Sequence, residues 1–187
     1  MPHDPALEAH EHTEHAHHAA HEQDPFISRV AITVAVLAVL AAAATSLETV
    51  EGGLAITASS EAVLAQDKAT DAWNEYQADS LKKHLYGIAA KEGGPHAAEF
   101  AEESKSQGEK QDPIRERAKE NEAESARLVA ESGAHERRHH WLTGAATLIE
   151  IGIALSTVAI ITRARSFWAA ALGLGALGLA LGAFAFV

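Results

Sequence analysis

Residues 141–187 read WLTGAATLIEIGIALSTVAIITRARSFWAAALGLGALGLALGAFAFV, and this stretch decides the fold class. It contains two apolar blocks, 141–162 and 167–187, that are separated only by residues 163–166. As an α-helix each block would be about 30 Å long, which matches the hydrocarbon thickness of a bilayer. Because the link is so short, the two helices must run antiparallel. The stretch therefore predicts a transmembrane hairpin.

A third apolar block lies near the N-terminus, where no charged residue occurs between Arg29 and Glu48. Asp24 and Pro25 precede it and supply an N-cap oxygen followed by a proline at the first helical position. We expect a transmembrane helix over residues 25–47. A cleaved signal peptide is the alternative, but the residues before this block are acidic where a signal peptide is basic. We therefore favour an uncleaved anchor.

The composition excludes several classes of protein. The chain has 187 residues, with 26 acidic and 15 basic residues, 12 histidines and no cysteine. An acidic chain is a poor match for nucleic acid, which is bound through clustered Lys and Arg. The lack of cysteine excludes disulfides and thiolate metal sites. We expect no nucleic-acid partner, and no small-molecule substrate is identified.

The segment between the first two apolar blocks, residues 48–140, carries 19 acidic and 12 basic residues and is rich in helix formers. Gly52 and Gly53 are expected to loosen the first helix as it leaves the membrane. The pattern then predicts, in order, a helix from Leu54 to Ala90, a turn over 91–95, a short helix over 96–107 ending at Gly108, and a helix opened by Asp112-Pro113. Together these elements form a long helical hairpin.

The sequence thus predicts an all-α membrane protein with three transmembrane helices and a long extramembrane helical hairpin between spans one and two. The predicted parts are a His-rich acidic tail expected to be disordered (1–24), transmembrane helix 1 (25–47), the extramembrane hairpin (48–140), transmembrane helix 2 (141–162), a short basic loop (163–166) and transmembrane helix 3 (167–187). Arg163 and Arg165 in the short loop favour a cytoplasmic N-terminus and an extracytoplasmic hairpin.

Heptad stepping predicts a weak seam between the two arms of the hairpin. The first-arm series is Val63, Asp67, Thr70, Asn74, Gln77, Leu81, His84 and Ile88, and the second-arm series is Ile114, Ala118, Asn121, Ser125, Leu128, Ser132, His135 and His139. Few of these residues are apolar, so one hairpin buries little by itself. We expect that several copies assemble, or that a partner helix covers the face from Trp73 to Ile88.

One pattern on the second arm is typical of zinc proteases. His135-Glu136-Arg137-Arg138-His139 fits H-E-x-x-H, in which two histidines bind zinc and the glutamate activates water. A catalytic zinc needs a third ligand, for which His84, His140 and Glu150 are available, but none lies at a recognised spacing. A solvated polar helix end is the favoured interpretation, and we assign no catalytic residue.

Two further features could bind metal ions or protons. The tail histidines interleave with carboxylates, a composition that suits loose binding of divalent metals or a pH response; they are His10, His12, His15, His17, His18 and His21. Glu150 lies inside the second apolar block, where a carboxylate is a functional-site hypothesis by default. The other two spans offer no ionisable group for a relay, so we assign neither a metal site nor a cofactor.

The third apolar block contains Gly173, Gly175, Gly178 and Gly182. The last two form G-x-x-x-G, a spacing that lets helices pack closely within or between chains. Residues 173–178 also fit a dinucleotide fingerprint, but no strand precedes them and the block is apolar throughout, so a nucleotide site is excluded.

Three segments together resemble a known family: DPF at 24–26, DAWNEYQADSLKKHL at 71–85 and TRARSFW at 162–168. The chain resembles the bacterial membrane-protein family catalogued as domain of unknown function 4337, over most of its length. The resemblance implies a multi-pass protein of the bacterial inner membrane with a helical hairpin outside the bilayer, and it implies no activity.

Our leading hypothesis is a non-enzymatic, oligomeric membrane scaffold whose hairpin binds copies of itself or partner helices. One alternative is a zinc-dependent membrane protease that uses His135, Glu136 and His139. A second alternative is a metal-binding or transport accessory that uses the His-rich tail and Glu150.

Overall fold

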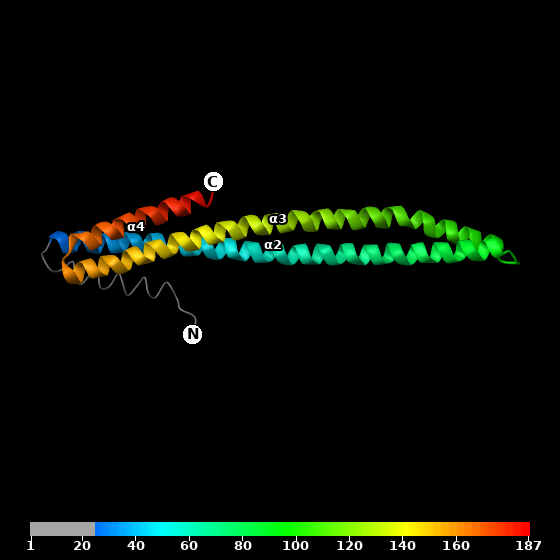
Figure 1. Ribbon diagram of the computed structural model, residues 1–187, viewed down its shortest axis with the longest axis horizontal. Coiled ribbons are helices and arrows are strands. Elements are labelled where there is room, and N and C mark those ends of the chain that lie inside the picture. The colour runs from blue at the N-terminus through cyan, green and yellow to red at the C-terminus, as the bar shows by residue number, and fades with distance from the viewer. Residues whose placement is uncertain (1–24) are drawn as a thin grey trace. The chain divides into compact units, whose positions relative to one another are not determined.

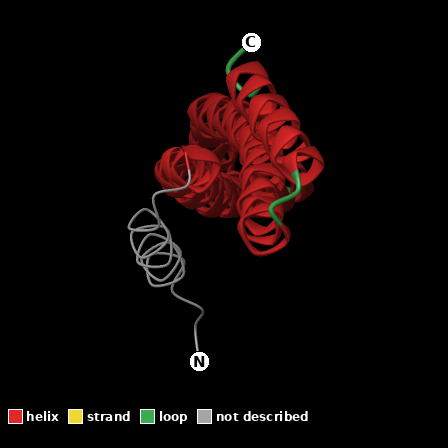
Figure 2. Cartoon of the chain, turned by 90° about the vertical axis from the view of Figure 1, so that its left-hand side faces the viewer, coloured by secondary structure: helices red, strands yellow, loops and turns green. Residues whose placement is uncertain are grey.

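The computed structural model describes residues 25–187, and this part of the chain consists of helices joined by short turns, with no strand (Figures 1 and 2). Its helices are α2 (Pro25–Glu92), α3 (Ala97–Thr162) and α4 (Arg165–Phe184). Each contains an apolar segment long enough to cross a membrane. The expected all-α class is confirmed for the described residues, and three helices have the length and composition of membrane spans.

The helix ends follow local sequence chemistry. α2 begins at Pro25, whose missing N–H is unneeded in the first turn. The turn between α2 and α3 contains Gly93 and Gly94, whose φ angles are 82° and 106°. Residues that carry a Cβ rarely adopt such positive φ angles. Between α3 and α4 the chain reverses at Arg163, which has a φ of 54°. Both turns lie in segments where the sequence predicts them.

Two expected interruptions are wrong. α2 runs through Gly52 and Gly53 without a break, and α3 runs through Gly108 and Pro113. A proline inside a helix removes one backbone hydrogen bond, but the residues around it are held by burial against α2. Gln111 and Ile114 are 9% and 7% exposed, so packing maintains the helix across the proline.

The chain divides into two compact units. Residues 25–55 and 133–187 form one, which we call the three-helix unit because α2, α3 and α4 all contribute to it. Ile56–Ser132 form the other, which we call the two-helix unit. Within each unit α2 and α3 pair antiparallel, as Figure 1 shows.

In the two-helix unit α2 presents a row of alanines to α3. They follow heptad steps of four and three residues and are all buried: Ala58, Ala62, Ala65, Ala69 and Ala72. On α3 the buried residues include four members of the predicted second-arm series, Ile114, Ala118, Ser125 and Leu128, and also Gln107 and Gln111, which lie outside that series. The Ser125 hydroxyl donates a hydrogen bond of 3.0 Å to the carbonyl oxygen of Ala62. The seam thus pairs small residues on α2 with mixed residues on α3.

The predicted first-arm seam is wrong. All eight of its positions are exposed, including Val63, Leu81 and Ile88, which are 60%, 62% and 57% exposed. The prediction gave weight to large apolar side chains, whereas α2 uses alanines because small residues let two helix backbones approach closely. The large apolar side chains of the predicted series, Val63, Leu81 and Ile88, consequently point away from α3.

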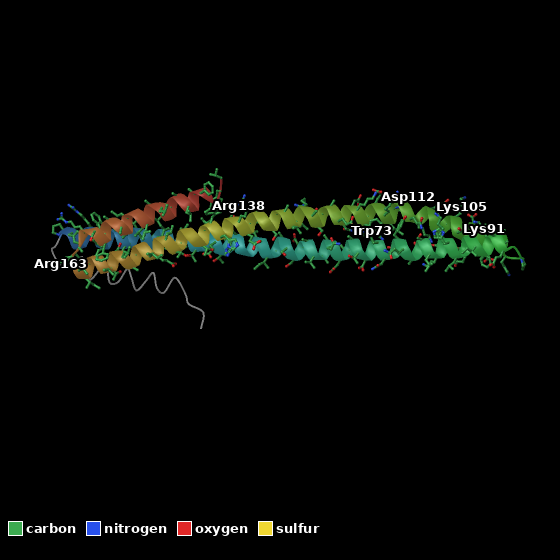
Figure 3. The ribbon with its side chains drawn as sticks, viewed as in Figure 1. Trp73, Lys91, Lys105, Asp112, Arg138 and Arg163 are labelled. Carbon is green, nitrogen blue, oxygen red and sulfur yellow. The ribbon has the colours of Figure 1, made fainter. Side chains whose placement is uncertain are left out.

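The face of α2 from Trp73 to Ile88 is partly covered by α3 and partly exposed to solvent. Trp73 and Tyr76 pack on the buried cluster that contains Ile114, and their rings meet edge to face at 5.7 Å. The indole N–H of Trp73, labelled in Figure 3, donates a hydrogen bond of 2.8 Å to Glu122 on α3. The exposed part of the face consists of Leu81, Leu85 and Ile88.

Ala118 tests how closely the helices of this unit pack. It has no exposed surface, so a leucine at this position would force α2 and α3 apart. We expect Ala118→Leu to lower the free energy of unfolding by about 2 kcal/mol. Urea unfolding of the full-length protein in detergent micelles, followed by circular dichroism, measures this. Ala126→Leu, at an exposed position of the same helix, is the control and should change little.

In the three-helix unit α4 lies beside α2 and α3, as the end view in Figure 2 shows. The core cluster consists of Ala31, Val34, Leu37, Ala38, Ala41, Ile149 and Ile153. α4 approaches it through glycines, because a Cβ added to Gly178 would lie 2.8 Å from the carbonyl oxygen of Ala145. The G-x-x-x-G residues therefore pack within the chain. At the other end of α4, Trp168 donates a hydrogen bond of 3.1 Å to Thr33 on α2.

Candidate functional site

A group of polar residues joins α2 to α3 inside the three-helix unit. Glu48 and Glu51 lie one turn apart on α2, and His135 and His139 lie one turn apart on α3. Because the helices are antiparallel, His135 meets Glu51 and His139 meets Glu48. We call these four residues, together with Arg138 and Thr143, the Glu–His junction. It lies next to the apolar segments of both helices.

The centre of the Glu–His junction is a contact between the His135 ring and the Glu51 carboxylate that is largely shielded from water. The Nδ1 atom of His135 lies 2.5 Å from Oε2 of Glu51, and the two side chains are only 17% and 10% exposed. Arg138, labelled in Figure 3, places Nη1 at 3.9 Å from the same carboxylate oxygen. A carboxylate that has lost most of its water depends on a hydrogen-bond donor and on nearby positive charge, and here His135 is the hydrogen-bonding partner and Arg138 is the nearby charge.

The second half of the junction uses the backbone of α2. His139 Nδ1 lies 3.1 Å from the carbonyl oxygen of Glu48, which can only accept, so this nitrogen carries the proton. The Thr143 hydroxyl lies 2.7 Å from the Glu48 carboxylate and donates to it. Gly52 makes room for the imidazole, because a Cβ there would lie 3.2 Å from His139 Nδ1. The junction thus fixes both histidine rings.

The H-E-x-x-H residues are divided between two faces of α3. His135 and His139 turn Nδ1 toward α2, whereas Glu136 is 65% exposed at its side chain and lies 3.8 Å from Nε2 of His140. Within residues 25–187 no group of three or more His, Asp or Glu side chains is arranged to hold a metal ion. His84, one of the available third ligands, is exposed on α2 in the two-helix unit.

The other candidate residues from the sequence, Glu150 and the tail histidines, do not contribute to the Glu–His junction. Glu150 is exposed on α3, on the far side of the helix from the core cluster that contains Ile149 and Ile153. The tail histidines (His10, His12, His15, His17, His18 and His21) lie outside the described residues. The structure thus brings together His135 and His139, and it does not bring Glu136 or Glu150 to them.

Sequence reasoning missed Glu48, Glu51, Gly52 and Thr143. The signal that could have found them is the register of an antiparallel pair. A turn at Gly93-Gly94 with equal rise along both helices places residues at equal distances from the turn opposite one another, which brings position 51 opposite 135 and position 48 opposite 139. Two acids would then have been expected beside two histidines.

An exposed ion pair outside the junction joins Arg127 to Glu124 on α3. The Arg127 guanidinium donates hydrogen bonds of 2.8 and 2.7 Å to both carboxylate oxygens of Glu124 and lies beside it as a positive charge, which lowers the pKa of Glu124. Both groups are exposed, so this pair contributes little to stability. It differs in this respect from Glu51, which is mostly buried.

Comparison with known proteins gives one informative match. No curated protein and no solved structure matches the chain. The family described as Domain of unknown function (DUF4337) matches residues 26–187, which include the Glu–His junction and almost the whole of α2, α3 and α4. Because this match covers most of the sequence, the chain belongs to the DUF4337 family.

Proposed function

We propose that the protein is an integral membrane scaffold: α4 and the apolar parts of α2 and α3 anchor it in the bilayer, and the two-helix unit stands outside and binds other protein chains. The observation that carries this proposal is the exposure of the apolar segments. Only 33%, 39% and 17% of the most apolar segments of α2, α3 and α4 are buried within the chain. Apolar surface on this scale is covered by lipid.

The two-helix unit supports the second half of the proposal. Its surface carries many charged side chains, which suits water, but Leu81, Leu85 and Ile88 follow one another at helical spacing and are all more than half exposed. Such a stripe is a typical contact for a partner helix. The Glu–His junction supports a structural role, since its histidines are bonded to α2.

The proposed location is the bacterial inner membrane, with a cytoplasmic N-terminus. Arg163 and Arg165 lie in the connection between the second and third spans, and short loops rich in arginine stay in the cytoplasm. With three spans, the two-helix unit is then extracytoplasmic.

The experiment uses the natural lack of cysteine. Single-cysteine variants Ala123→Cys, in the two-helix unit, and Ser166→Cys, at the end of the short loop, are expressed in bacteria and treated with a membrane-impermeant maleimide. We expect labelling at position 123 in cells whose outer membrane is permeabilised, and at position 166 only after the inner membrane is opened. The unsubstituted chain is the control and should remain unlabelled.

Two outcomes would contradict different parts of the proposal. Reversed labelling would overturn the orientation and leave the anchoring intact. Release of the protein from membranes by alkaline carbonate would overturn the anchoring itself, because integral proteins resist this extraction.

A further inference from the structure

Three arginines lie at one end of the three-helix unit. Arg29 is near the start of α2, Arg163 is in the connection between α3 and α4, and Arg165 is the first residue of α4. All three are exposed, and Figure 3 labels Arg163 at this end. We call these three residues the arginine end.

Contacts between α2 and α4 show that these two helices run parallel. The indole N–H of Trp168 donates a hydrogen bond of 3.1 Å to the Thr33 hydroxyl. Further along both helices, a Cβ added to Gly175 would lie 2.5 Å from Leu37. Residue numbers therefore rise in the same direction on the two helices, and both helices begin at the arginine end.

This register brings Arg29 and Arg165 to the same level. Arg165 precedes Trp168 by three residues, so equal rise along both helices places it level with position 30 of α2, next to Arg29. The axes of packed helices lie about 8–10 Å apart. Two long arginine side chains on neighbouring helices at this separation can reach a single anion between them.

No described acid compensates these two arginines. Acidic residues are absent from 25–47 and from 151–187, so the described part of the chain places no carboxylate beside Arg29 or Arg165. The other end of the unit differs, because the Glu–His junction supplies carboxylates to the cations there. The described residues of the arginine end thus carry a net positive charge that a separate anion can neutralise.

The aromatic residues beside the arginine end indicate which anion is at hand. Phe26 and Trp168 meet edge to face, with ring centroids 6.0 Å apart. Tryptophan in membrane proteins gathers at the level of the lipid headgroups. In a bilayer this pair places the arginine end at the depth of the lipid phosphates.

We infer that Arg29 and Arg165 together bind the phosphate group of an anionic lipid of the phosphatidylglycerol class. This inference rests on the proposed anchoring in the membrane and not on the orientation. A guanidinium group donates paired hydrogen bonds to two oxygens of one phosphate. The headgroup of phosphatidylcholine carries a cation of its own and so gains less from two arginines, which makes the site selective for anionic lipid.

Tryptophan quenching by brominated lipid tests the site. The full-length Trp141→Phe chain, in which Trp168 is the remaining tryptophan of the three-helix unit, is reconstituted in phosphatidylcholine vesicles with a small fraction of brominated lipid. We expect brominated phosphatidylglycerol to quench Trp168 more strongly than brominated phosphatidylcholine at equal fraction. In the matched Trp168→Phe chain, which retains Trp141 at the other end, both lipids should quench equally. Equal quenching of Trp168 by the two lipids would overturn the inference.

Arginine variants in the Trp141→Phe chain identify the ligand-binding side chains. We expect Arg29→Gln and Arg165→Gln each to lower the preference for phosphatidylglycerol about fivefold. Arg137→Gln, which removes an exposed arginine at the other end of the unit, is the control and should leave the preference unchanged. A preference that survives in both arginine-end variants, or that falls equally in the control, would overturn the inference.

A competition arm distinguishes a lipid phosphate from a free one. Inorganic phosphate is added to the same vesicles, and sodium chloride of equal ionic strength is added to a parallel sample. We expect the same preference for phosphatidylglycerol in both samples. Loss of the preference in phosphate alone would overturn the lipid as the ligand and assign the arginines to free phosphate.

Carbonate extraction of the same vesicles separates this inference from the proposed function. A chain that resists extraction but shows no preference for phosphatidylglycerol overturns only the lipid site. A chain that is extracted overturns the anchoring and, with it, the lipid site.

Discussion

Alanine in place of His135 is expected to lower the free energy of unfolding by about 3 kcal/mol, because it leaves a mostly buried carboxylate without its closest donor. Glu51 is only 8% exposed, and the Arg138 guanidinium lies 3.9 Å away, beyond hydrogen-bonding distance. Urea unfolding of the full-length protein in detergent micelles, followed by circular dichroism, measures the loss. The Glu51→Leu/His135→Leu double variant should recover most of the stability, since it removes both members of the pair.

The matched control is Glu136→Ala. Glu136 lies next to His135 in sequence but is 65% exposed at its side chain, so its removal should change stability by less than about 0.5 kcal/mol. The zinc-protease alternative predicts a different pattern, in which Glu136→Gln abolishes proteolysis and leaves the fold intact. Equal stability of the His135→Ala variant and the unsubstituted chain would contradict the structural role of the Glu–His junction.

Alanine in place of Gly178 is expected to destabilise the three-helix unit by about 2 kcal/mol. The added Cβ would meet the carbonyl oxygen of Ala145 and Cγ1 of Ile149, each at 2.8 Å. The carbonyl oxygen of Ala145 belongs to the backbone of α3, so it cannot relieve the clash by rotating, as the end of a flexible side chain could. α4 must therefore move away from α3, which exposes packed surface of both helices.

Gly173 provides the control for Gly178 on the same helix. Nothing lies within 4 Å of a Cβ added at Gly173, so Gly173→Ala should leave stability unchanged or raise it slightly, because alanine favours the helix. Resistance of α4 to proteolysis in micelles compares the two variants with the unsubstituted chain. Equal protection of Gly178→Ala and Gly173→Ala would contradict the close packing of α4 on α3.

Helices were predictable wherever one local rule dominated. The uncharged block after Arg29, the Gly93-Gly94 turn and the Arg163 connection each follow from length, hydropathy or backbone conformation, and the structure has helices and turns at these places. The break predicted before Pro113 was wrong. A proline inside a helix removes one backbone hydrogen bond, but the burial of Ile114 against α2 keeps α3 helical there. Packing between helices outweighed a single residue's preference there.

The candidate site was harder to predict because it depends on two segments far apart in sequence. His135 and His139 are visible as a pair on one helix, and their spacing matches a zinc motif. Their partners, Glu48 and Glu51, are ordinary acids until the register of α2 on α3 is known. That register was missed because alanine, which forms the seam, is common throughout the chain and gives no distinct pattern.

The alanine row of the two-helix unit has a consequence for how α2 and α3 are aligned lengthwise. Ala58, Ala65 and Ala72 repeat every seven residues, as do Ala62 and Ala69, so sliding α2 by two turns would replace alanine by alanine over much of the row. Apolar burial alone distinguishes such alternatives weakly. The hydrogen bond from Trp73 to Glu122 joins two particular side chains and is satisfied in one alignment only, whereas the backbone carbonyl oxygen that accepts from Ser125 has an equivalent at every residue of α2. A polar contact between side chains therefore selects the alignment, and apolar contacts hold the helices together once it is selected.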